Sequence, residues 1–390
     1  AGRRSFAQGH RRRGDVSDIR AFTLSVAEDE LVALADRLDR VRWPEQEPVA
    51  DWSQGTKLTV LRELVAYWRI EYDWRRCEAR LNALGQFKTE IDGLDIHFLH
   101  RRSSRAGAVP LLLTHGWPGS VVEFFGVIDD LVEPEDPDAM AFHVIAPSLP
   151  GYGFSDKPAN TGWGVERIAR AWTELMSRLG YTEWLAQGGD WGAAVTTAIG
   201  QLAPEGCRGI HLNMPIGRPG PDDMNSRDPK VLKALERLGF YQQWDSGYSK
   251  QQSTRPQTIG YALVDSPVAL AAWILEKVFY WTDNDGSPWD ALSMDQVIDD
   301  VMLYWLPATG ASAARLYWES FADFGDGKVT IPAGASAFPK EILPAPREWV
   351  ERTLTNLVYW NEVEKGGHFA AWEQPELFAR ELRACFAKMT

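Results

Sequence analysis

Residues 184–200 read WLAQGGDWGAAVTTAIG, and this stretch decides the fold. A short apolar run typical of a strand ends in two glycines, and a run of small residues typical of a helix follows Asp190. Small neighbours let the backbone bend sharply between a strand and a helix, as in a nucleophile elbow. Asp also caps helices, but Gly188, Gly189 and Gly192 around this one favour the elbow. We therefore predict that Asp190 is a nucleophile.

Strand-like and helix-like segments alternate on both sides of the elbow. Short apolar runs bounded by turn residues indicate buried strands, and amphipathic runs indicate helices. The predicted strands are LDIHFLHRR (94–102), VPLLLTHG (109–116), AFHVIAPSLPGYGFSD (141–156, ending in a Gly/Pro turn), GIHLNMP (209–215), KVTIPAGASAF (328–338) and LTNLVYW (354–360). The flanking helices are VERIARAWTELMSRLG (165–180) and QPELFARELRACFAKM (374–389). This order predicts an α/β protein with a mostly parallel central sheet covered on both faces.

The alternation stops between residues 216 and 325, a segment rich in aromatic residues, Asp, Gly and Pro. It is too long for a loop, so we interpret it as a helical lid inserted over the strand ends, where α/β sheets bind ligands.

The segment before the first strand is predicted to be helical. Apolar residues recur at helical spacing in 27–41 and 58–84, and Ser25 with Glu28 fits a capping box. The predicted organisation is a basic tail outside the fold (1–21), an N-terminal helical segment (22–92), the first part of the core (93–215), the lid (216–325) and the second part of the core (326–390).

Composition excludes several classes of protein. The net charge of −13 over 390 residues argues against a nucleic-acid partner. Three distant cysteines, Cys77, Cys207 and Cys385, form neither a metal motif nor a disulfide framework, which favours a reducing, cytoplasmic location. No apolar run approaches the ~18 residues of a membrane helix. The 18 Trp fit either a large apolar cavity or bulky core packing.

The base and the acid should follow the nucleophile along the chain. Only His211 and His368 follow Asp190, and His211 comes too soon for a strand bearing the acid to intervene. His368, in KGGHFAAWEQP (365–375), is therefore the predicted base. Glu341 is the first acid after the strand that follows the lid, and we choose it as the triad acid. The alternatives are Glu348, Glu351, Asp222 and Asp223.

The motif THGWPGS (114–120) follows a predicted strand and has the small residues of an oxyanion loop. Backbone N–H groups of Trp117 and Trp191 are predicted to form the oxyanion hole. The indoles of both residues, together with Phe154, are predicted to line the substrate pocket. A turn without a catalytic role is the alternative for this motif.

An aspartate nucleophile indicates attack at saturated carbon. A serine would form an inert ether there, whereas a carboxylate forms an ester that activated water can cleave. Epoxides and alkyl halides are therefore the expected electrophiles, and an epoxide needs a proton donor such as a neutral Tyr. The lid offers Tyr241, Tyr248, Tyr261, Tyr280, Tyr304 and Tyr317, among which composition does not choose. From ordinary pKa values of about 3.9 and 6.5, Asp190 is expected to be ionised and His368 neutral at pH 7.

Four motifs carry a resemblance that runs from about residue 22 to the C-terminus: HGWPGS (115–120), GGDWG (188–192), DSPVALAAWILEK (265–277) and GGHFAAWEQPELF (366–378). Together they resemble the microsomal-type epoxide hydrolases, including the juvenile-hormone and bacterial members. The resemblance implies an α/β-hydrolase fold with an N-terminal helical meander. The sequence departs from the mammalian members in lacking their membrane-anchoring N-terminal helix, so no membrane anchor is expected. It also implies the triad of Asp190, Glu341 and His368, with Tyr248 in DSGYS and Tyr317 in RLYWES polarising the epoxide.

The sequence thus predicts a cofactor-free and metal-free epoxide hydrolase. We expect it to open a bulky apolar epoxide, aryl or polycyclic, to a vicinal diol through a covalent Asp190 ester. Its partners would be the epoxide and water, and the oligomeric state, with a homodimer among the possibilities, stays open. Bacterial relatives serve detoxification or natural-product assembly, including that of enediyne antibiotics, and both roles stay open. The alternatives are a haloalkane dehalogenase and a non-catalytic ligand-binding protein.

Overall fold

A nine-stranded sheet runs through the centre of the protein in the computed structural model, which describes residues 19–321 and 327–389. The strand order is β1-β2-β3-β5-β4-β6-β7-β8-β9. The strands are β1 (Arg20–Phe22), β2 (Gln86–Ile91), β3 (Leu94–Arg101), β4 (Val109–Thr114), β5 (Phe142–Pro147), β6 (Trp184–Gly188), β7 (Cys207–Leu212), β8 (Ala333–Ala337) and β9 (Leu357–Glu362). All pairs from β5 to β9 are parallel, while β1, β2 and β3 add an antiparallel edge. This confirms the predicted α/β-hydrolase fold.

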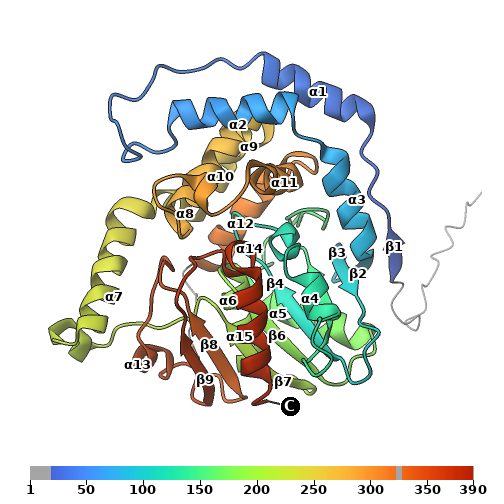
Figure 1. Ribbon diagram of the computed structural model, residues 1–390, viewed down its shortest axis with the longest axis vertical. Helices are drawn as coiled ribbons and strands as arrows, with labels where there is room; N and C mark the ends of the chain where they lie inside the picture. The colour runs from blue at the N-terminus through green and yellow to red at the C-terminus, as the bar shows by residue number, and fades with distance from the viewer. Residues whose placement is uncertain (1–18, 322–326, 390) are drawn as a thin grey trace, which may run out of the picture.

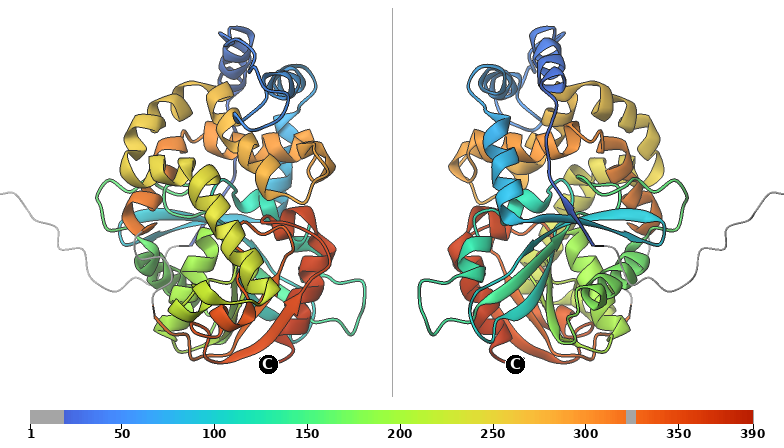
Figure 2. Two further views of the ribbon diagram at one scale, coloured as in Figure 1. Left: turned by 90° about the vertical axis from the view of Figure 1, so that its left-hand side faces the viewer. Right: turned by 90° about the vertical axis from the view of Figure 1, so that its right-hand side faces the viewer.

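Helices cover both faces of this sheet, as predicted from the alternation of strand-like and helix-like segments along the sequence. Figures 1 and 2 show α5 (Val165–Arg178) and α6 (Trp191–Leu202) on one face, and α4 (Ile128–Val132) and α15 (Pro375–Phe386) on the other. In α5 the buried residues Ile168, Trp172 and Leu175 recur at helical spacing and bury one apolar stripe. The parallel strands are consequently apolar on both sides, which explains their unbroken hydrophobic sequences.

The helices between β7 and β8 form a cap above the carboxyl ends of the strands (Figure 2). They are α7 (Pro229–Phe240), η3 (Tyr241–Asp245), α8 (Gly247–Thr254), α9 (Pro256–Asp265), α10 (Pro267–Trp281), η4 (Pro288–Asp290), α11 (Met294–Trp305) and α12 (Gly310–Ser320). The break between α9 and α10 follows from local chemistry. The Ser266 hydroxyl accepts the N–H of Ala269 at 3.1 Å, and Pro267 occupies the first turn, where its missing N–H costs nothing.

The N-terminal segment forms α1 (Glu28–Asp39), α2 (Leu58–Ile70) and α3 (Trp74–Leu84), which lie over the cap and beside the core (Figure 1). Two details differ from the sequence prediction. Residue Ala27 precedes α1 without a side-chain cap, so the predicted Ser25 capping box is wrong. The predicted helix over 58–84 breaks before Asp73, whose carboxylate accepts the N–H of Arg75 at 2.9 Å and starts a new helix.

This segment also supplies β2, although it was predicted to be only helical. β1 begins at Arg20, inside the predicted tail, so the prediction that residues 20 and 21 lie outside the fold is wrong: they pair with β2. The predicted basic tail falls mostly on residues 1–18, outside the described residues. The limits of the five predicted segments stay predictions.

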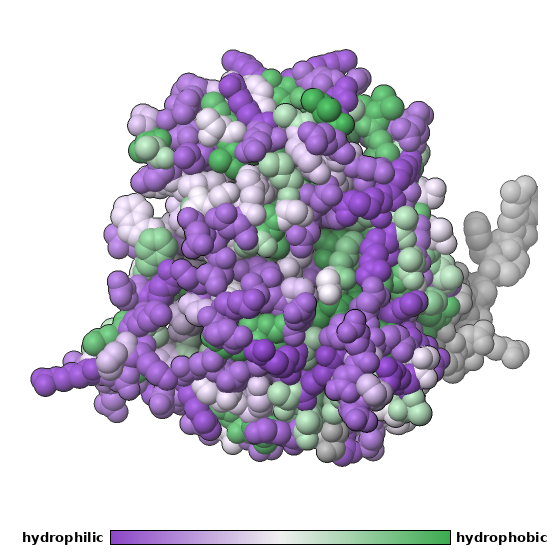
Figure 3. Space-filling view, viewed as in Figure 1, coloured by the Kyte–Doolittle hydropathy of each residue, from purple (hydrophilic) through white to green (hydrophobic). Residues whose placement is uncertain are grey.

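The face of the molecule drawn in Figure 3 is mostly hydrophilic with small scattered apolar patches. Within 19–321 and 327–389, no single helix has both the length and the apolar character needed to cross a membrane. In the same residues, α9 and α10 meet the two criteria when they are taken together, and this pair is bent by 115°.

Candidate active site

Asp190 lies between β6 and α6 with φ of +51° and ψ of −127°, a conformation that non-glycine residues rarely adopt. The surrounding backbone is too close for side chains. A Cβ on Gly192 would lie 1.8 Å from the carbonyl oxygen of Thr114, and a Cβ on Gly188 would lie 2.0 Å from that of Gly192. The glycines therefore permit the bend that exposes Asp190 at the end of the central strand.

The oxyanion loop contacts this carboxylate directly. The backbone N–H of Trp117 donates to Asp190 Oδ1 at 2.8 Å. A Cβ on Gly116 would lie 2.3 Å from the Asp190 side chain, so the loop approaches as closely as its glycine allows. Trp191 is the first residue of α6, where backbone N–H groups have no acceptor within the helix. The Trp117 N–H thus contacts the carboxylate, and the part of the Trp191 N–H in an oxyanion hole stays a prediction.

His368 and Glu341 complete a buried chain of three side chains. His368 Nδ1 lies 2.8 Å from Glu341 Oε1, and His368 Nε2 lies 3.3 Å from Asp190 Oδ2. Glu341 Oε1 also accepts the N–H of Ile342 at 2.7 Å, which fixes its orientation. The structure therefore brings together the three residues that the sequence placed in the triad.

The protonation of His368 differs from the expectation of a neutral imidazole. Burial alone lowers its pKa, but the charges of Glu341 and Asp190 outweigh burial and raise the pKa well above its usual value. The two flanking carboxylates therefore favour the imidazolium form of His368 in the resting protein.

The histidine and the four carboxylates that were the alternatives for the triad either have other partners or are exposed. His211 is buried in β7, 2.9 Å from the Ser336 hydroxyl, and burial lowers its pKa to about 3. Asp223 pairs with Arg352, and Glu351 pairs with Arg347 on its own short helix. Glu348 and Asp222 are exposed. Of the candidate acids, only Glu341 contacts His368.

Two cap phenols lie beside the oxyanion loop. The ring centroids of Tyr248 (α8) and Tyr317 (α12) are 5.7 Å apart. Both rings contact the Trp117 indole, with centroid distances of 4.8 and 5.9 Å. Burial raises the pKa of each phenol well above 10, with nearby acidic groups adding to the shift. Both are therefore neutral donors at physiological pH.

The remaining cap tyrosines are engaged elsewhere or exposed. Tyr304 donates to the Gly119 carbonyl, and Tyr280 donates to the Trp52 carbonyl. Tyr261 is 69% exposed. Tyr241 lies behind Tyr248, with 3.0 Å between the two hydroxyls, and thus supports that phenol.

A buried ion pair behind Tyr248 escaped the sequence analysis. Lys277 Nζ lies 2.7 Å from Asp245 Oδ1 and 4.7 Å from the Tyr248 ring centroid. The Trp281 indole donates to Asp245 Oδ2 at 2.7 Å. The signal was a lysine at the end of the apolar run 267–281, where a buried cation requires a partner.

The predicted lining residues have different surroundings. The Trp191 ring meets Tyr317 edge-on at 4.8 Å, within the aromatic cluster around Asp190. Phe154 instead packs against Phe22 and His97, at 5.8 and 5.6 Å. None of its recorded ring contacts is with that cluster, so its role in substrate binding stays a prediction.

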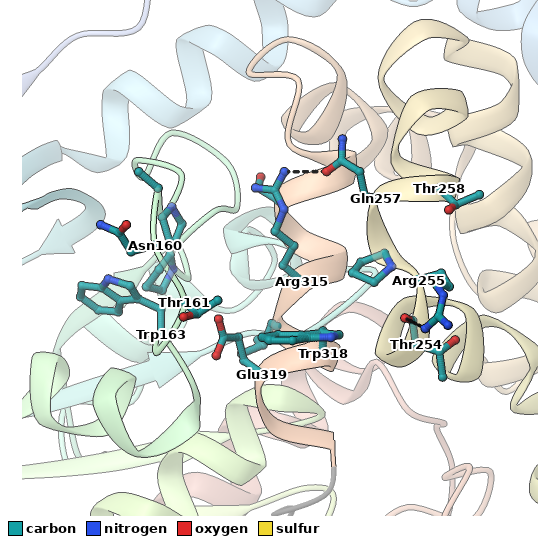
Figure 4. Close-up of a pocket in the computed structure, with 16 residues that line it drawn as sticks. Asn160, Thr161, Trp163, Thr254, Arg255, Gln257, Thr258, Arg315, Trp318 and Glu319 are labelled. Carbon is teal, nitrogen blue, oxygen red and sulfur yellow. Dashed lines mark hydrogen bonds between the residues drawn. The ribbon is translucent and has the colours of Figure 1, made fainter.

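Two cavities flank this region. A small polar cavity of about 20 Å³ is bounded by Asp190, His368 and Glu123, together with backbone of the oxyanion loop. A hollow of about 560 Å³ lies between α12 and the 158–163 loop, where Trp318 and Trp163 face it and Arg315 bonds Gln257 (Figure 4). It contains none of the predicted catalytic residues, whereas Asp190 and His368 border the small cavity.

A carboxylate at the elbow, aligned with a buried His–Glu pair, makes the protein an α/β hydrolase, and the family model described as alpha/beta hydrolase fold matches residues 109–375. A second model, described as epoxide hydrolase N terminus, matches residues 19–124. The chain belongs to the epoxide hydrolase family, and the protein is an epoxide hydrolase.

Three relatives support this assignment. The chain is 53% identical to a candidate epoxide hydrolase of Stigmatella aurantiaca (strain DW4/3-1), covering 95% of this chain and 85% of the relative. It is 36% identical to epoxide hydrolase 1 of Sus scrofa, over 94% of this chain and 88% of that one. The solved structure of Aspergillus niger epoxide hydrolase superposes with a TM-score of 0.88 at 35% identity, covering 96% and 97% of the two chains.

Proposed function

We propose that this epoxide hydrolase works through a covalent ester on Asp190. The observation that carries the proposal is that the two oxygens of the Asp190 carboxylate have different partners. Oδ1 accepts the Trp117 N–H, whereas Oδ2 faces His368 Nε2 at 3.3 Å. Oδ2 is thus the attacking atom, and Oδ1 remains in the oxyanion hole as the carbonyl oxygen of the ester.

In the first step Asp190 Oδ2 bonds to one oxirane carbon, and the bond from that carbon to the ring oxygen breaks. Tyr248 or Tyr317 gives its proton to the oxygen that is released, which would otherwise leave as a strongly basic alkoxide. In the second step water gives a proton to His368 and its oxygen adds to Asp190 Cγ. The Trp117 and Trp191 N–H groups stabilise the resulting oxyanion. Its collapse breaks the bond from Cγ to the diol oxygen, which takes the proton held by His368 and leaves as a vicinal diol. The second proton of the added water passes from the Asp190 carboxyl to the Tyr phenolate, so that both side chains return to their starting states.

The charge on His368 supports this order of steps. Part of the elevation of its pKa comes from the Asp190 carboxylate. Esterification removes that negative charge, so the pKa of His368 falls when the ester forms. The imidazole accordingly becomes a competent base only after the nucleophile has reacted.

The aromatic cluster beside the oxyanion loop supports an apolar substrate, aryl or polycyclic. The cavity at Asp190 is only about 20 Å³, so a bulky epoxide requires these rings to move apart. The aromatic rings of Trp117, Tyr248, Trp281 and Tyr317 contact one another there and offer few polar groups besides the phenols. Detoxification and natural-product assembly both use such an activity. A haloalkane dehalogenase is less favoured because a departing halide needs no phenol, and its activity would survive loss of both tyrosines.

Heavy-oxygen water tests the covalent mechanism. With enzyme in excess over a styrene-oxide-like substrate, a single turnover should place the label in the Asp190 peptide and none in the diol, as read by mass spectrometry. A His368→Gln variant should stop at the ester and show the substrate mass on the same peptide. Label in the diol alone after one turnover would contradict the proposal.

A further inference from the structure

The loop that carries the catalytic base is held by its backbone. His368 N–H donates to the Trp281 carbonyl at 2.8 Å, and Gly366 N–H donates to Asp283 Oδ2 at 2.9 Å. Trp281 ends α10 and Asp283 follows it, so both acceptors belong to the cap. The base is therefore attached to the cap rather than only to the core.

The other two N–H groups of this loop share one buried carboxylate. Gly367 N–H donates to Glu373 Oε2 at 3.1 Å, and Phe369 N–H donates to Glu373 Oε1 at 3.0 Å. Asp283 N–H donates to the same Oε2 at 2.7 Å. Glu373, the last residue of α14 (Ala370–Glu373), thus binds both neighbours of His368 and the end of the cap helix.

This arrangement matters because few side-chain contacts fix the distance between the imidazole and Asp190. Glu341 sets the rotation of the ring through Nδ1. The approach of Nε2 to Asp190, at 3.3 Å, depends in addition on where the backbone of His368 stands. A shift of about 1 Å in a reacting group can cost about a hundredfold in rate.

We propose that Glu373 is a positioning residue for the hydrolytic step, and that with Asp283 it couples the cap to the catalytic base. This inference rests on the proposed two-step mechanism. Alkylation of Asp190 does not use His368 as a base, whereas cleavage of the ester does. Loss of Glu373 should consequently slow the second step and spare the first.

A purely structural carboxylate would behave differently, and the chain offers one for comparison. Glu381 in α15 is also buried and accepts from Ser336, Tyr359 and Asn361 at 2.8, 2.8 and 3.0 Å. It joins α15 to β8 and β9 and has no contact with the His368 loop. Glu381→Gln is therefore the matched control for loss of a buried carboxylate.

The experiment measures the two steps separately in Glu373→Gln, Asp283→Asn, Glu381→Gln and the wild type. Burial raises the pKa of Glu373 to about 7, so the assays are run well above pH 7, where the wild-type carboxylate is ionised. Rapid mixing with a styrene-oxide-like substrate gives the alkylation rate, and quenched intact mass gives the fraction of ester at steady state. Thermal unfolding reports stability for every variant.

For Glu373→Gln we expect an unchanged alkylation rate, a hydrolysis rate lower by about 10- to 100-fold and accumulation of the Asp190 ester. Asp283→Asn removes the charge of a part-buried acceptor but keeps an acceptor oxygen. It should fold normally and is expected to shift the same balance by less. Glu381→Gln should lower the melting temperature without ester accumulation.

Two other outcomes would overturn different statements. Equal loss of both rates in Glu373→Gln and Asp283→Asn, or ester accumulation in Glu381→Gln as well, would overturn the positioning role. Absence of an ester even in His368→Gln would instead overturn the covalent mechanism on which the inference rests.

Discussion

At the scale of single residues, the site depends on close backbone approaches that leave no room for a Cβ. Asp190 occupies a strained conformation at φ of +51°, and such strain persists only where its surroundings enforce it. Among the glycines around Asp190, Gly188 and Gly192 face backbone carbonyls, and Gly192 has the less room of the two. The Thr114 carbonyl beside it cannot rotate away. The position of the Asp190 carboxylate therefore depends on glycine at these neighbouring positions.

Gly192→Ala should destabilise the protein by about 3 kcal/mol or more, because the added Cβ would overlap the Thr114 carbonyl at 1.8 Å. Chemical denaturation measures the change. Gly239→Ala in α7 is the control, since a Cβ there meets nothing within 4 Å and alanine favours a helix by about 0.5–1 kcal/mol. Equal stability of the two variants would show that the elbow tolerates side chains.

The charge of Glu341 makes a prediction about pH. Glu341 helps to raise the pKa of His368, so Glu341→Gln should lower that pKa. Hydrolysis of the ester needs neutral His368 and fails as pH falls below its pKa, so the acidic limb of kcat should move to lower pH. The plateau should fall by about 100- to 10,000-fold, because Gln can hold the wrong tautomer. A pH profile of kcat checks both effects.

Glu348→Gln provides the control for that profile, because Glu348 is an exposed carboxyl a few residues along the chain. It should leave the position of the limb and the plateau unchanged. An acidic limb that does not move in Glu341→Gln would mean that another group controls the base.

Sequence reasoning reached Asp190 and His368 because chain order and glycine spacing are local properties. It left several candidates beside Glu341, since only tertiary structure shows which carboxylate meets the imidazole at 2.8 Å. The six cap tyrosines were equivalent by composition, and Tyr248 and Tyr317 were singled out by resemblance alone. The rise in the pKa of His368 could not be predicted from ordinary values, because it comes from two neighbours distant in sequence.

At the scale of elements, local patterns gave the types of most segments but not all of their ends. The elbow strand and helix, and most of the strands after residue 93, followed from periodicity. β1 is three residues long and acquires its identity by pairing with β2, for example Arg20 with Lys88. Such long-range pairing leaves no period in a short sequence. The absent Ser25 cap shows likewise that a capping pattern needs the right helix start.

The helix α10 supplies a prediction about the cap. Lys277→Met should destabilise the protein by about 3–5 kcal/mol, because it leaves the Asp245 carboxylate buried without its cation. Urea unfolding measures the effect. Lys230→Met, which breaks an exposed pair with Glu362, should cause no measurable change. If the double variant Lys277→Met/Asp245→Asn were no more stable than Lys277→Met, the unpaired charge would not be the cause.

At the scale of the whole molecule, the N-terminal helices and the cap form one unit above the sheet (Figure 2). Tyr72 and Arg76 in the N-terminal segment bind Asp299 of α11, at 2.7 and 2.9 Å. α11 in turn holds the oxyanion loop, since Asp300 accepts the Ser120 hydroxyl at 2.7 Å. The sequence predicted helices here, but which surface they cover is a property of the assembled chain.

Arg76→Met should therefore weaken the protein in a pH-dependent way. Burial raises the pKa of Asp299 to about 6, while Tyr72 and Arg76 oppose that rise, so the variant raises the pKa further. Arg76 stabilises only ionised Asp299. Its contribution is consequently absent well below pH 6 and grows as pH rises through about 6, to about 1 kcal/mol because the guanidinium is half exposed.

Urea unfolding of Arg76→Met and the wild type at acidic and alkaline pH measures this difference. Arg208→Met, which breaks an exposed pair with Glu183, is the control and should be indistinguishable from the wild type at both pH values. A loss of stability that is the same at acidic and alkaline pH would show that Arg76 acts through packing of its stem. In that case the charge of Asp299 would not link the N-terminal segment to the cap.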